Sequence, residues 1–112
     1  MSFDVYDKNE KRADELQEKY GLTMVLHDLF AWEALTEAEV IHIQNYKDRE
    51  HPRYTGNYDE DSVLSEAFDK KISALNLTES MLTDSCAKEL YENGCLELDE
   101  AIELQKFRAL AE

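Results

Sequence analysis

Acidic residues and two of the three histidines lie together in the stretch EAEVIHIQNYKDREHP, residues 37–52. Glu39 and His42 form a Glu-x-x-His pair, and residues three apart on a helix project from the same face. Di-iron carboxylate bundles use two such pairs and two further glutamates in each site. The second copy here would end at His51, on the same helix and next to the helix-breaking Pro52. We therefore expect a solvated helix face, and keep a metal-dependent enzyme built on Glu39 and His42 as an alternative.

Asn57, Asp59 and Asp61 have the spacing of the first three ligands of a calcium-binding loop. That loop also needs glycine at its sixth position and glutamate at its twelfth, where this chain has Ser62 and Phe68. We expect these acidic residues to stabilise the positive N-terminal end of a helix instead. The sequence predicts no metal and no cofactor.

Residues that support nucleophilic catalysis are missing from the sequence. It has no glycine-flanked serine, no phosphate-binding glycine loop and no dinucleotide-binding fingerprint. His27 lies in the most apolar segment, which is typical of a core histidine. Cys86 and Cys95 fit neither a zinc pattern nor a redox pair, so we expect buried thiols in a reducing compartment. The sequence therefore predicts no catalytic residue and no enzyme activity.

The net charge is −14 over 112 residues, and it is unevenly spread. Residues 1–56 carry 12 acidic and 7 basic residues, whereas residues 57–112 carry 14 and 5. Such a field repels nucleic acids and anionic membranes and attracts basic proteins. Without a long apolar run or an apolar leader, the chain is expected to be cytoplasmic.

The length and the 43% apolar content predict one folded domain, residues 1–112. Few glycines and prolines, together with apolar residues at helical spacing, predict an all-α fold, a compact array of five to six short helices. Residues 51–61 are expected to form a loop between two helical halves. The expected helices cover about residues 8–20, 22–35, 36–50, 62–75, 78–93 and 99–110.

Capping residues set several of these boundaries. Thr36 and Glu39 form a Thr-x-x-Glu capping box, and Thr78 and Asp99 are expected to cap the last two helices. Residues 22–35 are apolar on most sides, which predicts a helix that is buried on most sides, with a strand as the alternative.

The acidic residues of the C-terminal half recur on helix surfaces that the apolar stripes leave outside. Basic grooves of DNA-binding proteins match a dense line of negative charge, so a helix carrying carboxylates can occupy such a groove. Exposed tyrosines would add aromatic anchors. The expected acidic patch is Asp59, Glu60, Asp61, Glu66, Asp69, Glu97, Asp99, Glu100 and Glu103, and the expected anchors are Tyr54, Tyr58 and Tyr91.

These features predict a non-enzymatic inhibitor that binds a basic, nucleic-acid-binding protein and mimics nucleic acid, without binding nucleic acid or membrane itself. Phage inhibitors of restriction or CRISPR machinery are one biological setting for such a protein. The alternative is a helical adaptor, antitoxin or immunity-type protein that binds through apolar and tyrosine contacts. An ordinary soluble acidic protein, whose charge recognises nothing, stays open as well.

Thr36 to Glu39 and Glu50 to Pro52 resemble fragments of the immunity proteins of DNase colicins, which are small, acidic and helical. In that family the two fragments lie farther apart and a tyrosine pair follows them. Here both the spacing and the tyrosine pair are missing, and the likeness covers seven residues. It does not identify the chain as a member of the family.

Overall fold

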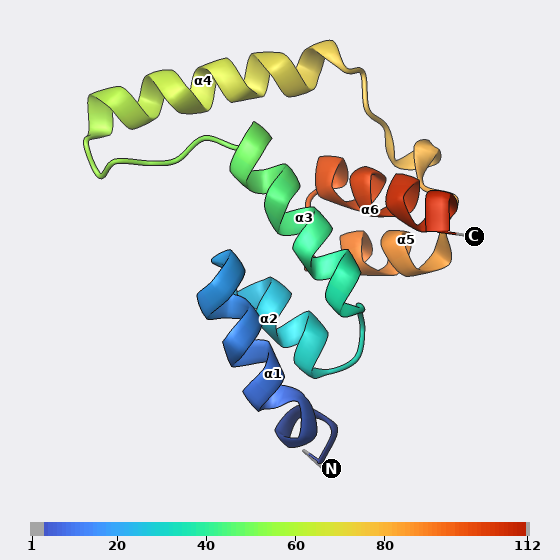
Figure 1. Cartoon of the computed structure of the whole chain (residues 1–112). Coiled ribbons are helices and arrows are strands. Elements are labelled where there is room, and N and C mark those ends of the chain that lie inside the picture. Colours follow the sequence, from blue (N-terminus) through green and yellow to red (C-terminus); the bar gives the residue numbers. More distant parts are fainter. Residues whose placement is uncertain (1–3, 112) are drawn as a thin grey trace. The chain divides into compact units, whose positions relative to one another are not determined.

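The computed structural model describes residues 4–111, and this part of the chain consists of helices joined by loops, with no strand (Figure 1). The predicted all-α class is therefore confirmed. None of these helices is long and apolar enough to cross a membrane. The elements are α1 (Asp4–Tyr20), α2 (Met24–Ala31), α3 (Glu37–Glu50), α4 (Tyr58–Ala74), the 3-10 turn η1 (Glu79–Met81), α5 (Ser85–Glu92) and α6 (Leu98–Ala111).

Two compact units divide the chain, and the boundary between them falls within α3, after Asn45. The prediction of a single domain over residues 1–112 stays a prediction. Each unit has its own set of buried apolar side chains. In the first unit they are Ala13, Leu16, Leu22, Leu26, Leu29, Ala31, Leu35, Val40 and Ile43. In the second they are Leu82, Ala87, Leu90, Leu96, Ala101, Ile102 and Leu104.

Short turns in the first unit bring α1 and α2 into contact. Gly21 ends α1 with a φ of +70°, a conformation that glycine adopts without strain, and its N–H donates to the Gln17 carbonyl. The Thr23 hydroxyl then caps α2 by accepting the Leu26 N–H at 3.3 Å. The amide oxygen of Gln44, on α3, accepts the Thr23 N–H at 3.1 Å and so fixes the turn.

The predicted capping box at the start of α3 is confirmed. The Thr36 N–H donates to the Glu39 carboxylate at 2.8 Å, and the Glu39 N–H donates to the Thr36 hydroxyl at 3.2 Å. Both bonds use only local residues, and the first engages one oxygen of the Glu39 carboxylate that the metal alternative required.

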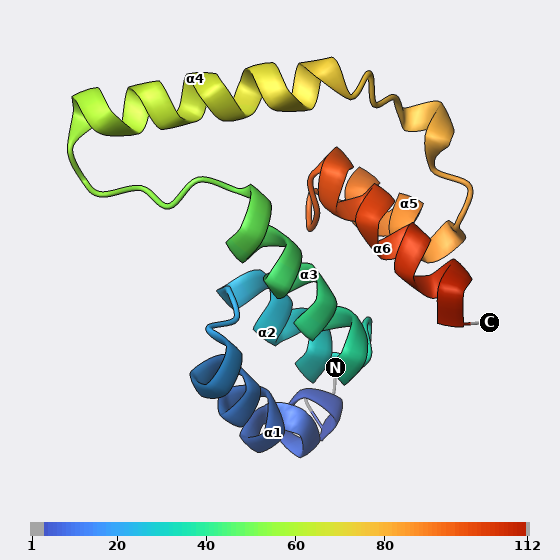
Figure 2. The same cartoon turned by 45° about the horizontal axis from the view of Figure 1, so that its top comes forward.

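In the second unit, α5 and α6 pack side by side (Figure 2). Asp84 caps α5 by accepting the Ala87 N–H at 3.1 Å. The side-chain oxygen of Gln105, on α6, accepts the N–H groups of Thr83 and Asp84 at 2.7 and 2.8 Å. The Arg108 guanidinium also donates to the Asp84 carboxylate, so that the start of α5 is bonded to α6.

Several predicted boundaries are wrong. The first helix begins at Asp4, and the apolar helix is only Met24–Ala31, because the chain turns at Glu33 with a positive φ. The long loop is shorter than expected, since α4 already begins at Tyr58. The helix expected from Thr78 to Asn93 is the turn η1 followed by α5, and the Thr78 side chain makes no capping bond.

The apolar segment 22–35 is also less buried than predicted. Leu26 and Leu29 are buried, but Met24, Val25 and Trp32 are more than two-fifths exposed. The strand alternative for this segment is wrong because α2 occupies its centre.

Candidate functional site

The helix α4 carries a concentrated group of exposed carboxylates. Its first three turns and the residue after them, residues 58–69, contain five acidic and no basic residues. Asp59, Glu60, Glu66 and Asp69 are exposed, and Asp61 is half-buried. No residue of α4 is buried, and four of its residues are half-buried: Asp61, Ser65, Phe68 and Ile72. Its nearest bases follow at Lys70 and Lys71.

Capping interactions hold this acidic turn in place. The Asn57 side-chain oxygen accepts the N–H groups of Asp59 and Glu60 at 3.0 and 3.2 Å. The Asp61 carboxylate reaches back to accept the N–H groups of Thr55 and Gly56 at 2.7 and 3.0 Å. The bond from the Thr55 N–H lowers the pKa of the Asp61 carboxyl, and partial burial opposes this effect less strongly. The loop before α4 is therefore joined to its first turn.

Exposed aromatic and aliphatic side chains lie among these carboxylates. Tyr54 is 61% exposed, Tyr58 is 85% exposed and Val63 is 67% exposed. Tyr54 and Tyr58 line a shallow hollow with Glu66 and Asp69, which is open to solvent. These exposed residues of α4, together with Tyr54 from the loop before it, are called the exposed α4 surface: Tyr54, Tyr58, Asp59, Glu60, Val63, Glu66 and Asp69.

The other predicted patch residues do not share this exposure. Glu97 is exposed and Glu103 is half-buried, but Asp99 and Glu100 are only 6% and 4% exposed. The Glu100 carboxylate accepts the Glu97 N–H at 2.9 Å and pairs with Lys47 at 2.9 Å. The expectation that Asp99 and Glu100 lie on the outer surface is therefore wrong, because each is buried against partners.

Tyr91 is half-buried and differs from the two exposed tyrosine anchors. Its hydroxyl donates to the Glu79 carboxylate at 2.8 Å. This bond raises the pKa of the Tyr91 hydroxyl, with a smaller contribution from burial. Its polar end is therefore already engaged within the unit.

Asp99 is the centre of a hydrogen-bond network in the second unit. Its Oδ2 atom accepts the Tyr46 hydroxyl at 2.8 Å and lies 2.7 Å from the His51 Nε2 atom. The His51 ring also packs against Phe68, with ring centroids 4.6 Å apart. Burial raises the pKa of the Tyr46 hydroxyl, and the bond to Asp99 raises it further, so the group stays protonated and donates. The predicted capping role of Asp99 is wrong, because it lies inside α6.

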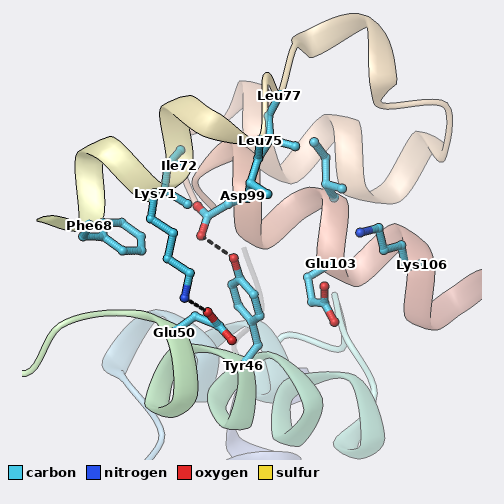
Figure 3. A pocket seen from close by; sticks show the side chains of 11 residues that line it. Tyr46, Glu50, Phe68, Lys71, Ile72, Leu75, Leu77, Asp99, Glu103 and Lys106 are labelled. Carbon is cyan, nitrogen blue, oxygen red and sulfur yellow. Dashed lines mark hydrogen bonds and ion pairs between the residues drawn. The ribbon is translucent and has the colours of Figure 1, made fainter.

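Figure 3 shows the Tyr46–Asp99 hydrogen bond of this network at the edge of a pocket of about 590 Å³, including space open to solvent. Lys71, from α4, reaches across and forms an ion pair with Glu50. That pair lowers the pKa of the Glu50 carboxyl. The remaining lining consists of the charged side chains of Glu103 and Lys106 and of five apolar side chains: Phe68, Ile72, Leu75, Leu77 and Ile102. No local pattern in the sequence indicates this pocket, because its residues come from segments far apart in the chain.

The metal candidates that the sequence suggested are not brought into a common site. Among residues 4–111, the group with ligand atoms close enough for an ion is His51, Glu97 and Asp99, without Glu39 or His42. The second metal candidate, Asn57, Asp59 and Asp61, lies at the start of α4, where Asn57 and Asp61 accept backbone N–H groups. Cys86 and Cys95 are half-buried and form no disulfide with each other. The absence of enzyme activity stays a prediction.

In the first unit, His27 is only 3% exposed and contacts two carboxylates. Its Nε2 atom lies 2.7 Å from Asp14, and its Nδ1 atom lies 2.9 Å from Asp28. Burial lowers the pKa of the ring, but the hydrogen bonds to Asp28 and Asp14 raise it by more, so the pKa lies above its usual value of 6.5. The core histidine that the sequence predicted is therefore bonded at both nitrogens, as an imidazolium requires.

The stability of the protein is expected to fall with rising pH because of His27. The folded state holds this proton more tightly than the unfolded state, so the stabilisation is complete below a pH of about 6.5. It is lost as the pH rises through the higher pKa of the folded state. Urea unfolding between about pH 6 and 9 should show this fall in the wild type and a smaller one in His27→Gln. Equal pH profiles for wild type and His27→Gln would contradict the assignment.

Comparison of the chain with protein-family models, curated proteins and solved structures found no match.

Proposed function

We propose that this protein is a non-enzymatic binding protein that docks the exposed α4 surface onto a basic, nucleic-acid-binding protein and blocks it. The observation that supports the proposal is the row of carboxylates in residues 58–69, with no base among them. Four of these carboxylates are exposed to solvent: Asp59, Glu60, Glu66 and Asp69.

The spacing of these charges suits a surface that binds nucleic acid. Twelve helical residues span about 18 Å, at about 1.5 Å per residue. Asp61 is half-buried, so four exposed carboxylates over that length give about one charge per 4.5 Å, a spacing of the same order as the one phosphate per about 3.4 Å of a DNA strand. A groove whose lysines and arginines match a phosphate row can therefore pair with one side of α4.

Apolar contacts would supply the part of the affinity that does not depend on salt. Tyr54, Tyr58 and Val63 lie beside the carboxylates and are largely exposed. Interfaces favour tyrosines near their centres, because these side chains bury a large area at a small entropic cost. The carboxylates would speed the encounter and fix its orientation, so association should be fast and should weaken as salt rises.

Affinity chromatography on the immobilised chain tests the proposal. A retained partner should be basic, should elute when the salt concentration is raised, and should also be displaced by duplex DNA that competes for the same groove. Retention that is unchanged between low and high salt would contradict the proposal. It would instead favour the alternative of a helical adaptor or immunity-type protein that binds mainly through Tyr54, Tyr58 and Val63.

A further inference from the structure

A histidine and two carboxylates from distant segments meet in the second unit. His51 follows the end of α3, and Glu97 and Asp99 lie at the start of α6. One ligand atom from each residue lies within 4.8 Å of the other two. Imidazole nitrogen and carboxylate oxygen are both donors that zinc and similar divalent ions accept in proteins.

We propose that His51, Glu97 and Asp99 bind one divalent transition-metal ion, for which Zn²⁺ is the probe. Ligand atoms around Zn²⁺ lie about 2.0–2.2 Å from the ion, so neighbouring ligands are about 3.3–3.5 Å apart. The His51 Nε2 and Asp99 Oδ2 atoms are 2.7 Å apart and need to separate only slightly. The ion takes the place of the hydrogen that bridges them.

The surroundings hold two of the three ligands in place. The Tyr46 hydroxyl donates to Asp99 at 2.8 Å, and metal-bound carboxylates in proteins are commonly oriented by such outer donors. The His51 ring is held between Tyr46 and Phe68, with ring centroids 5.6 and 4.6 Å apart. Neither ligand would have to be ordered when the ion binds.

The third ligand, Glu97, lies on the side of the site that is open to solvent. The Glu97 side chain is exposed, so an ion would keep positions for water. The neighbouring Glu100 is already paired with Lys47 at 2.9 Å, and this cation opposes binding in part. Two carboxylates against one imidazole still leave the site with a charge that favours a dication.

Isothermal titration of the whole chain with Zn²⁺ tests the site. The expected result is one ion per chain in the wild type, with at least tenfold weaker binding in Glu97→Gln. Its matched control is Glu92→Gln, which removes an exposed carboxylate from α5 in the same unit and should bind like the wild type. Since Glu97 is exposed, its substitution should leave the fold intact, which circular dichroism checks.

His51→Ala should bind no stoichiometric ion. The proposal is overturned if the wild type binds no stoichiometric Zn²⁺, or if Glu97→Gln and Glu92→Gln bind it equally. Either result would show that His51 and Asp99 form only a structural hydrogen bond. The outcome does not depend on the proposed binding partner, because the readout is the ion itself.

Discussion

Replacing Asp99 with alanine is expected to lower the free energy of unfolding by about 2–4 kcal/mol. The change removes the acceptor for both the Tyr46 hydroxyl and the His51 ring. A fully buried polar group that loses its partner costs about 1–3 kcal/mol, and the two groups affected here are half-buried, so each should cost about 1–1.5 kcal/mol. The N-terminal turn of α6 also loses a negative charge that stabilises it by about 0.3–1 kcal/mol. Urea unfolding followed by circular dichroism measures the loss.

Asp69→Ala is the matched control for this prediction. It makes the same substitution at an exposed position of α4, where the free energy of unfolding should change by at most about 0.5 kcal/mol. A double-mutant cycle of Tyr46→Phe with Asp99→Ala should show a coupling between the two side chains. If Asp99→Ala destabilises no more than Asp69→Ala, the buried network does not contribute to stability.

Neutralising three carboxylates of the exposed α4 surface is expected to weaken partner binding by about 10- to 100-fold at low salt. The variant combines Asp59→Asn, Glu60→Gln and Glu66→Gln. Exposed ion pairs contribute about 0.2–1 kcal/mol each, and low salt favours the upper part of this range, so three pairs should contribute about 1.4–2.8 kcal/mol. About 1.4 kcal/mol corresponds to a tenfold change in affinity. Surface plasmon resonance with the retained basic protein measures the change, most of which should appear in the association rate.

A triple variant in α1 separates local recognition from total charge. Asp7→Asn, Glu10→Gln and Glu18→Gln remove the same three charges from exposed positions of the first unit. This control should keep an affinity within a few-fold of the wild type. Equal losses in both triple variants would mean that the overall charge attracts the partner without a defined docking surface.

Local capping signals predicted helix starts only where both partners lie in the same turn. The capping box of Thr36 and Glu39 is of this kind, and α3 begins where the sequence indicated. The prediction that Thr78 caps a helix was wrong, because the capping residue of α5 is Asp84, six positions later. The Asp84 N–H donates to Gln105 and the Arg108 guanidinium donates to the Asp84 carboxylate, and such long-range contacts leave no local pattern in the sequence.

The sequence predicted the exposed carboxylates of α4 but misplaced those of α6, because the partners of the α6 carboxylates are distant in the sequence. Four acidic residues of α4 are exposed as expected, whereas Asp61 is half-buried and bonded to the loop before the helix. Asp99 and Glu100 were misplaced, since their partners Tyr46, His51 and Lys47 lie about fifty positions earlier in the sequence. One signal was available: Glu100 follows Glu97 by three positions at a helix start, the spacing of a capping box.

Hydrogen exchange of backbone amides, measured with and without the bound basic partner, tests the docking surface most directly. The partner is expected to slow exchange in residues 58–69 and to leave the exchange of α1 unchanged. Slower exchange elsewhere, with residues 58–69 exchanging at the same rate in both states, would contradict the assignment of α4 as the binding surface.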